Sequence, residues 1–306
     1  MFEAKKAMLM YCTSPVHAGA GQAFGLIDNP IQRERHSEHP VIAGSGVKGA
    51  LRHHLYRQWA NNDEKQTKDL LNRIFGPESG ESSDYAGAIS FSDAQLLVFP
   101  IRCVKNGFVY ATSPLCLARA QRLLAMCGVQ TRWQIDEVKN NSIVTLNPEL
   151  LSGDSILLET QQFKANKNGN DDLKAIAENV AELALPDDPA YAYFRDKLKK
   201  DLVLLSDTDF NYFVKHATVV EAHVCIDEKT GTAKDGSLHY TENLPPESIL
   251  ISAAMATVER KKGGVSAEAM LAPVTSALDK ATIQIGGDAT TGRGQVILNL
   301  VGGNHG

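Results

Sequence analysis

The stretch HAGAGQAFGLIDNPIQRERHSEHPVIAGSGVKGALR, from His17 to Arg52, decides how the rest of the chain is interpreted. It opens with glycines, which let a backbone bend freely or come close to a partner. Asp28, Asn29 and Pro30 follow, a triplet that predicts a turn with its carboxylate presented on a loop. A segment of this kind suits a surface that binds a polyanion better than it suits a hydrophobic core.

Polar and basic side chains come directly after the presented acid. Arg33 and Arg35, with Gln32 before them, are candidates to bind phosphates, since a guanidinium can hold a phosphate bidentately. Glu34 lies between the two arginines, so a surface charge cluster is the alternative.

Apolar residues spaced four apart predict a helix from Val47 to Ala60, with Ser45 as a plausible N-cap. Lys48 and Arg52 share one side of this helix. Lys48 lies near the positive end, where backbone N–H groups and the helix dipole favour an anion. The two cations therefore predict phosphate contacts, and a solvated helix face is the alternative.

A second glycine-rich loop, GGDATTGRG at Gly286–Gly294, follows a predicted strand near the end of the chain. Its glycines are expected to expose backbone N–H groups along which a sugar-phosphate chain can lie. A plain glycine hairpin is the structural alternative. The candidate contacts are Gly286, Gly287, Thr290, Gly292 and Arg293.

Composition places the chain among ordinary globular proteins. Of 306 residues, 43% are hydrophobic and 22% are charged. No apolar run is long enough to span a bilayer and the start lacks a signal peptide, so we expect a cytoplasmic protein with no membrane partner. The five cysteines are scattered and never spaced as CxxC, which argues against a disulfide framework and a structural zinc site.

The net charge of −5 is unusual for a nucleic-acid-binding chain, but the charge is unevenly distributed. Residues 1–60 carry seven Lys and Arg against four Asp and Glu, a local charge of +3 that leaves −8 for the remainder. Exposed charges are screened beyond about 8–10 Å, so the field at a groove matters more than the total.

Strands and helices are mixed along the chain, which predicts an α+β fold. The sequence FSDA at Phe91–Ala94 is expected as a turn between two strands, and Lys164–Asp172 is the least ordered-looking segment. A hairpin is predicted at about Val219–Glu242. The main strands are expected at 7–12, 88–91, 95–101, 108–111, 202–206, 249–258 and 295–301, and further helices at 115–127, 173–185, 191–198, 207–215 and 266–281.

Several blocks occur in an order that resembles the RAMP superfamily of CRISPR proteins. They are GLIDNPIQRE, HPVIAGSGVKGALR, LLSDTDFNYFV, LHYTENLP and IGGDATTGRGQV. Within that superfamily the chain is most similar to the repeated backbone subunit of the type III-B (Cmr) RNA-guided effector complex. Ser37 stands where a threonine is common, and His239 where a tryptophan is common. Neither departure is expected to touch the acid or the glycine loops.

The resemblance implies a fold and a domain plan. It implies a modified ferredoxin-like (RRM-like) palm in a single elaborated domain, residues 1–306. Insertions of the palm would be a finger loop at about 17–45, a helical insertion at about 112–200 and a β-hairpin thumb at about 215–248.

The resemblance also implies a function, cleavage of target RNA at regular intervals along a guide. Asp28 matches the cleavage aspartate of the family, and would act on the target 2'-hydroxyl or hold Mg²⁺ or another divalent metal; from the residues alone, an Asx-turn acid is the rival reading. His17 is a weaker catalytic candidate, with a turn histidine as the alternative. Glu242 is a possible second carboxylate, with a solvated hairpin acid as the alternative.

The implied partners are guide CRISPR RNA, target RNA, further copies of the chain and other subunits of the effector complex. Rival functions are the equivalent subunit of a type III-A (Csm) complex, a non-catalytic RNA-binding scaffold and a stand-alone guide-processing endonuclease. All of these expectations require that Ile27–Pro30 and Gly286–Gly294 lie on the same side of the molecule.

Overall fold

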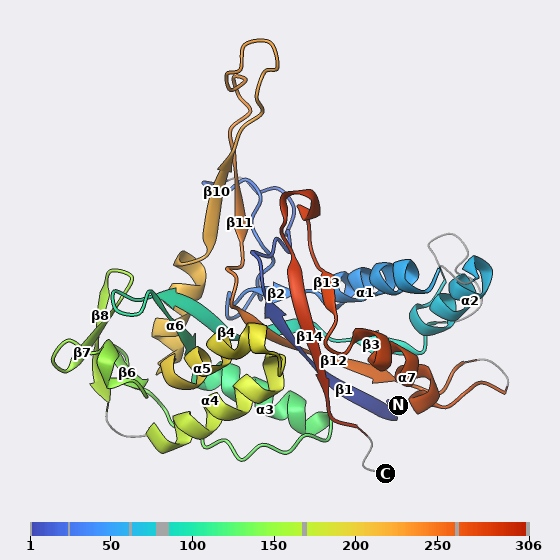
Figure 1. Cartoon of the computed structure of the whole chain (residues 1–306), viewed down its shortest axis with the longest axis horizontal. Coiled ribbons are helices and arrows are strands. Elements are labelled where there is room, and N and C mark those ends of the chain that lie inside the picture. Colours follow the sequence, from blue (N-terminus) through green and yellow to red (C-terminus); the bar gives the residue numbers. More distant parts are fainter. Residues whose placement is uncertain are drawn as a thin grey trace.

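The strands of the computed structural model form one large, mostly antiparallel sheet, from which a separate hairpin projects (Figure 1). The structure describes residues 2–23, 25–60, 63–77, 86–166, 170–260 and 263–303. Within them, the twelve-stranded sheet has the order β13-β14-β1-β12-β4-β5-β9-β6-β8-β7, with β2 (Val41–Ile42) on β4 and β3 on β12. Helices and strands are mixed along the chain, as expected for the α+β class.

Strand β1 (Ala4–Cys12) is central and pairs antiparallel with β12 (Ile249–Ala256) and β14 (Gln295–Val301). Strand β13 (Thr282–Gln284) continues the sheet beyond β14. Alternate side chains of β1 enter two different cores, Met8, Met10 and Cys12 on one face and Ala7, Leu9 and Tyr11 on the other. Because both faces are covered, this strand is apolar from Ala7 to Cys12.

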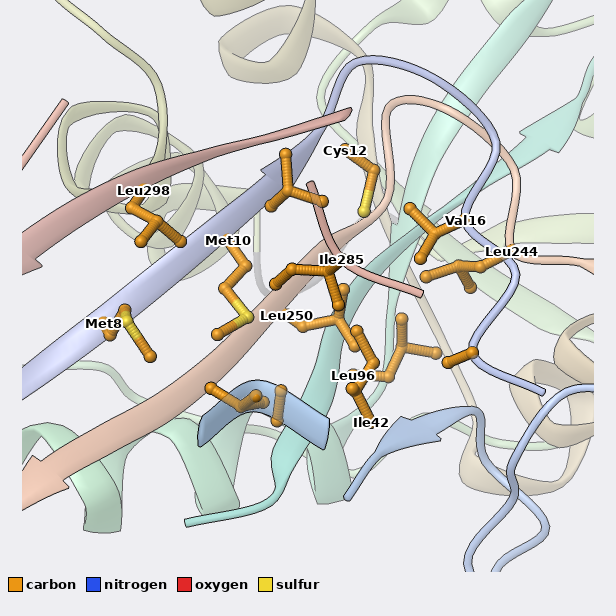
Figure 2. Packing of buried hydrophobic residues seen from close by; sticks show 14 of the residues in the cluster. Met8, Met10, Cys12, Val16, Ile42, Leu96, Leu244, Leu250, Ile285 and Leu298 are labelled. Carbon is orange, nitrogen blue, oxygen red and sulfur yellow. The ribbon is translucent and has the colours of Figure 1, made fainter. Parts of the chain in front are cut away.

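The first core lies between one face of the sheet and helices α1 (Gly44–Trp59), α2 (Glu64–Phe75), α6 (Asp207–His216) and α7 (Ala267–Leu278). The predicted apolar face of α1 is confirmed, since Val47, Leu51 and Leu55 are fully buried. Figure 2 shows Met8, Met10 and Cys12 packed with Leu250, Ile285 and Leu298.

The second core lies under α3 (Pro114–Met126), α4 (Asn170–Ala184) and α5 (Ala192–Asp201). Beyond β12 the sheet continues through β4 (Ala94–Arg102), β5 (Phe108–Thr112), β9 (Leu202–Leu205), β6 (Ser142–Thr145), β8 (Gln161–Asn166) and β7 (Ser155–Leu158). In the described part of the chain, no helix is both long and apolar enough to cross a membrane.

The predicted hairpin is confirmed as β10 (Val219–His223) and β11 (His239–Asn243), which project from the body of the molecule (Figure 1). Paired residues of an antiparallel hairpin share a face. One face therefore carries Glu221, His223, Thr241 and His239, and the other carries Val220, Ala222, Tyr240 and Glu242.

The structure differs from the sequence prediction at FSDA. Strand β3 (Ile89–Phe91) and strand β4 do not form a hairpin, because both pair antiparallel with β12. Ser92 and Asp93 interrupt one continuous edge, and the Ser92 N–H donates to the Ala253 carbonyl across the break.

The region from 112 to 200 contains strands as well as helices. Strands β6, β7 and β8 lie within it and extend the sheet. Part of the segment expected to be least ordered is regular as well, since β8 reaches Asn166 and α4 begins at Asn170. Residues 167–169 lie outside the described residues.

Candidate functional site

Asp28 lies on a loop that is hydrogen-bonded to the outer edge of β11. The Tyr240 N–H donates to Asp28 Oδ2 at 2.7 Å, and the Asn29 N–H donates to the Tyr240 carbonyl at 3.0 Å. One residue pair further, the Glu242 N–H donates to the Asn29 carbonyl. The predicted turn therefore presents its carboxylate beside the projecting hairpin, and Asp28 is half-buried there.

An open pocket of about 550 Å³ lies at this position. Its lining residues are Gln22, Ala23, Asp28, Asn29, Gly236, Leu238 and His239. Pockets of about 300–1,000 Å³ take small ligands, so a nucleotide unit fits this volume. The expectation that His239 lies away from the acid is wrong, since it borders the same space as Asp28, 211 positions away along the chain.

His17 joins the hairpin to the second glycine loop. Its Nδ1 hydrogen-bonds to the Glu242 carbonyl at 2.7 Å, and its own carbonyl accepts from the Gly287 N–H at 2.9 Å. A Cβ on Gly286, whose φ is +87°, would lie 2.3 Å from that carbonyl oxygen, so only glycine fits. The ring of His17 is thereby fixed between two backbone segments.

Two glycine-containing segments converge as the sequence prediction required. The 286–294 loop rests on His17, and the Asp28 loop rests on β11, so both lie at the base of the same hairpin (Figure 1). Gly294 adds a hydrogen bond from its N–H to the Pro15 carbonyl at 2.8 Å.

Glu242 is neither solvated nor exposed to a ligand. It is 2% exposed and its carboxylate accepts from Arg33 Nη2 at 2.5 Å, Thr218 Oγ1 at 2.8 Å and the Ile31 N–H at 3.1 Å. We call Glu242, Arg33, Thr218 and Ile31 the Glu242 cluster. The alternative of a solvated hairpin acid is wrong, and these contacts fix Glu242 within the protein.

Two side chains predicted to contact phosphates, Arg33 and Gln32, are instead hydrogen-bonded within the protein. Arg33 Nη1 donates to the Glu38 and Val214 carbonyls, each at 2.9 Å, in addition to the Glu242 contact. Gln32 donates to the Gly19 carbonyl at 3.0 Å and accepts from the Ala43 N–H at 2.8 Å. These side chains brace the loop. Arg35, in contrast, is exposed.

The start of α1 also differs from its prediction. Ser45 is exposed and is not the N-cap, because the helix begins at Gly44, whose N–H donates to Asp93 Oδ1 at 2.7 Å. Negative charge from Asp93 thus already occupies the helix N-terminus where a phosphate was expected.

Of the two cations on α1, Arg52 is hydrogen-bonded within the protein. Its guanidinium donates to the Gly76 carbonyl at 2.5 Å and to Asn72 Oδ1 at 2.7 Å, which fixes the end of α2. Lys48 remains a candidate phosphate contact. Partial burial, and secondarily the charge of Arg52, lower the pKa of its ammonium group.

The 286–294 loop makes more hydrogen bonds within the protein than its glycine content suggests. The N–H groups of Gly292, Arg293 and Gly294 donate to carbonyls of the protein. The Arg293 side chain pairs with Glu221 of β10, with Nη2 at 2.5 and 2.6 Å from the two carboxylate oxygens. Thr290 is exposed at the tip of the loop.

Comparison with known proteins identifies relatives along nearly the whole chain. Residues 9–297 match the family described as the RAMP superfamily. The "CRISPR system Cmr endoribonuclease Cmr4" of Pyrococcus furiosus is 32% identical over 302 residues, with 97% of each chain covered. The crystal structure of oligomeric Cmr4 from the same organism superposes with a TM-score of 0.73 at 27% identity, covering 98% of both chains.

A more distant structure shows the same fold. It is a cryo-EM structure of the type III-B Cmr-beta complex bound to cognate target RNA, 18% identical, with a TM-score of 0.72 and 98% of both chains covered. With the family match and the 32% identity over almost the full length, the chain belongs to the RAMP superfamily, within its Cmr4 family.

Proposed function

We propose that this chain is the repeated backbone subunit of a type III-B CRISPR effector complex, and that it is an endoribonuclease that cleaves target RNA through Asp28. The single observation that carries the proposal is the position of Asp28 on an open pocket at the hairpin base. Its relative in Pyrococcus furiosus is named an endoribonuclease. Among the described residues, a hydrogen bond is seen at only one of the two Asp28 carboxylate oxygens.

Guide RNA lies, in this proposal, along the 286–294 loop and the adjoining surface. Arg35 is exposed and Lys48 is partly exposed, so these two cations are the side chains best placed to hold its phosphates. Contacts of this kind read the backbone and not the bases, so one surface accepts any guide sequence. Gln32, Arg33 and Arg52 support this surface from within the protein.

The target strand crosses the pocket in our proposal. Asp28 accepts the proton of the target 2'-hydroxyl, the oxygen attacks the adjacent phosphorus, and the bond from phosphorus to the 5'-oxygen breaks. The products are a 2',3'-cyclic phosphate and a 5'-hydroxyl. His17 positions the glycine loop, since its ring and its carbonyl are both hydrogen-bonded.

If a hydrated Mg²⁺ takes part, Asp28 is the residue that would hold it. In the described part of the chain, no three His, Cys, Asp or Glu side chains gather as a metal-binding group. Mg²⁺ usually keeps several waters and binds through one or two carboxylates plus substrate phosphates, which a lone Asp28 fits. Such an ion would supply counter-charge for the phosphate.

The proposal extends to assembly and domain plan. Copies of the chain stack head to tail along the guide, a heterologous contact that generates an open filament, and each copy supplies one cutting site. Support comes from the oligomeric form of the Pyrococcus furiosus relative. The sheet around β1 is then a ferredoxin-like palm, with the 17–45 loop as its finger and the β10–β11 hairpin as its thumb.

Substitution of Asp28 by asparagine tests the proposal. The amide oxygen of the new side chain can still accept the Tyr240 N–H, so Asp28→Asn removes the charge and keeps the loop. In the assembled complex with Mg²⁺, we expect cutting of labelled target RNA to fall by about 10²- to 10⁴-fold with unchanged target affinity. Asp136→Asn, at an exposed acid outside the pocket, is the matched control.

Other outcomes distinguish the rival functions. Cutting at unchanged positions and rate by the Asp28→Asn complex would refute the assignment. A wild-type complex that binds target without cutting it, with or without Mg²⁺, would be a scaffold. Metal-independent cutting of precursor RNA by the isolated chain would indicate guide processing, and co-purification with type III-A subunits would move the chain to that complex.

A further inference from the structure

We propose that His239 is a second catalytic residue, which donates the proton to the leaving 5'-oxygen when target RNA is cut. This inference rests on the function proposed above and adds a general acid to it. In the sequence, His239 stood out only as a departure from the tryptophan common in the family, with no expected contact to the acid.

The first observation is the shared pocket. Asp28 and His239 both line the 550 Å³ space, although they come from different parts of the chain. The Tyr240 N–H, next to His239 along β11, holds Asp28 Oδ2 at 2.7 Å. A phosphodiester in this space therefore has a carboxylate and an imidazole available to it, the pair that an in-line transfer needs for its two protons.

The second observation is the hydrogen bond at one ring nitrogen of His239. Its Nδ1 lies 3.2 Å from the Ser237 carbonyl oxygen. A carbonyl oxygen can only accept, so Nδ1 carries a proton in this contact. The other nitrogen, Nε2, is then the one that gains and loses a proton, and the contact with Ser237 sets the ring's orientation.

The third observation is the set of groups on the same hairpin face. The His239 ring stacks on His223, with centroids 5.3 Å apart and planes 22° apart. His223 Nε2 lies 3.9 Å from Glu221 Oε2, and Arg293 binds Glu221. The stacked histidine pair therefore has Glu221 and Arg293 on the His223 side and borders the Asp28 pocket on the His239 side.

The proton balance of the step is complete. Asp28 takes the proton from the 2'-hydroxyl as the new bond from the 2'-oxygen to phosphorus forms. The bond from phosphorus to the 5'-oxygen breaks, and protonated His239 gives its Nε2 proton to that oxygen. Solvent then returns a proton to His239 and removes one from Asp28, so no further reactant is consumed.

A sulfur-substituted target RNA tests this role. When the 5'-bridging oxygen at one cut position is replaced by sulfur, the leaving thiolate is a weak base and needs no proton. In the assembled complex we expect His239→Gln and His239→Trp to cut the oxygen linkage about 10²-fold more slowly than wild type. The same variants should cut the sulfur linkage at close to the wild-type rate. His239→Trp keeps an aromatic surface, so it separates proton transfer from stacking.

The controls separate this inference from the proposed function. Asp28→Asn should be slow on both linkages, and His216→Gln, at an exposed histidine at the end of α6, should be slow on neither. If the His239 variants slow both linkages equally, the residue only shapes the pocket. If they slow neither, it takes no part. Either result overturns the inference and leaves the role of Asp28 standing.

Discussion

The Asp28 pocket and the Glu242 cluster flank the same strand, β11, and their carboxylates have different surroundings. Asp28 faces an open pocket and accepts a hydrogen bond from the Tyr240 N–H. Glu242 is 2% exposed and accepts from Arg33, Thr218 and the Ile31 N–H. A buried carboxylate must be paired to remain charged, whereas a carboxylate at a pocket can act on a ligand.

This difference separates the two tasks of the hairpin base. The Glu242 cluster fixes the loop to the body, because Arg33 reaches from the loop to the Val214 carbonyl near the end of α6. The pocket then holds Asp28 at a defined place on β11. Function at the pocket therefore depends on structure at the cluster.

The largest expected effect is on stability, from Glu242→Ala. The change leaves the Arg33 guanidinium without its carboxylate in a largely buried place. We expect the free energy of unfolding to fall by about 3 kcal/mol, the usual cost of breaking such a pair. Urea denaturation of the purified chain measures it.

A double variant sharpens that result. Glu242→Leu combined with Arg33→Met removes both charges, so it should recover much of the lost stability. If Glu242→Ala instead leaves stability unchanged and stops target cutting, Glu242 belongs to the chemistry and the contrast with Asp28 fails.

A smaller effect is expected from a third carboxylate, Glu247, which is partly buried beside two tyrosine hydroxyls. Its carboxylate accepts from the Tyr11 and Tyr110 hydroxyls, and burial raises the pKa of its carboxyl to about 7. Between about pH 4.5 and pH 7 the folded chain holds a proton that the unfolded chain has lost, so stability falls as pH rises through this window.

Glu247→Gln should remove this dependence. At pH 8 the free energy of unfolding of the variant should exceed that of wild type by about 1–2 kcal/mol. This value is smaller than the full pKa shift would give, because Glu247 is partly exposed to solvent. At pH 4.5 the gain should vanish. Urea denaturation at the two pH values tests this, and an equal gain at both would show that the group does not titrate as described.

Arg33 and Arg35 lie on the same loop and differ in the way the two carboxylates do. Arg33 is hydrogen-bonded within the protein, whereas Arg35 is exposed. Arg35→Ala should weaken guide RNA binding by about fivefold, and equally for every guide sequence. It should also reduce by about one the number of counterions released on binding, which the salt dependence of the affinity measures. Stability should stay within about 0.5 kcal/mol of wild type. Filter binding at several salt concentrations measures both binding quantities, and Arg132→Ala, at an exposed arginine after α3, is the control. An unchanged affinity would remove Arg35 from the RNA surface.

The smallest expected effect is that of Asp28→Asn on stability. The asparagine keeps an acceptor for the Tyr240 N–H and no buried partner loses its charge. We expect the free energy of unfolding to change by less than about 0.5 kcal/mol. A loss as large as that of Glu242→Ala would show that Asp28 is a structural acid.

Local sequence patterns predicted helices and strands well where one spacing of apolar residues dominated. The spacing of Val47, Leu51 and Leu55 predicted the buried face of α1, and the run at 7–12 predicted β1. The FSDA segment was misinterpreted because turn-forming residues look alike in a hairpin and in a break along one sheet edge. The partner strand that distinguishes them, β12, lies far away in the sequence.

The sequence by itself determined that the chain has an apolar central strand, an amphipathic α1, a presented Asp28 and a glycine loop. These follow from residue spacing and backbone preference, which act over a few positions. Only the tertiary structure decided which charged side chains are available. Arg33 and Glu242 are 209 positions apart, and Asp28 and His239 meet at one pocket across a similar gap. The availability of a charge depends on its neighbours in space, and those neighbours are set by how the hairpin packs on the loop.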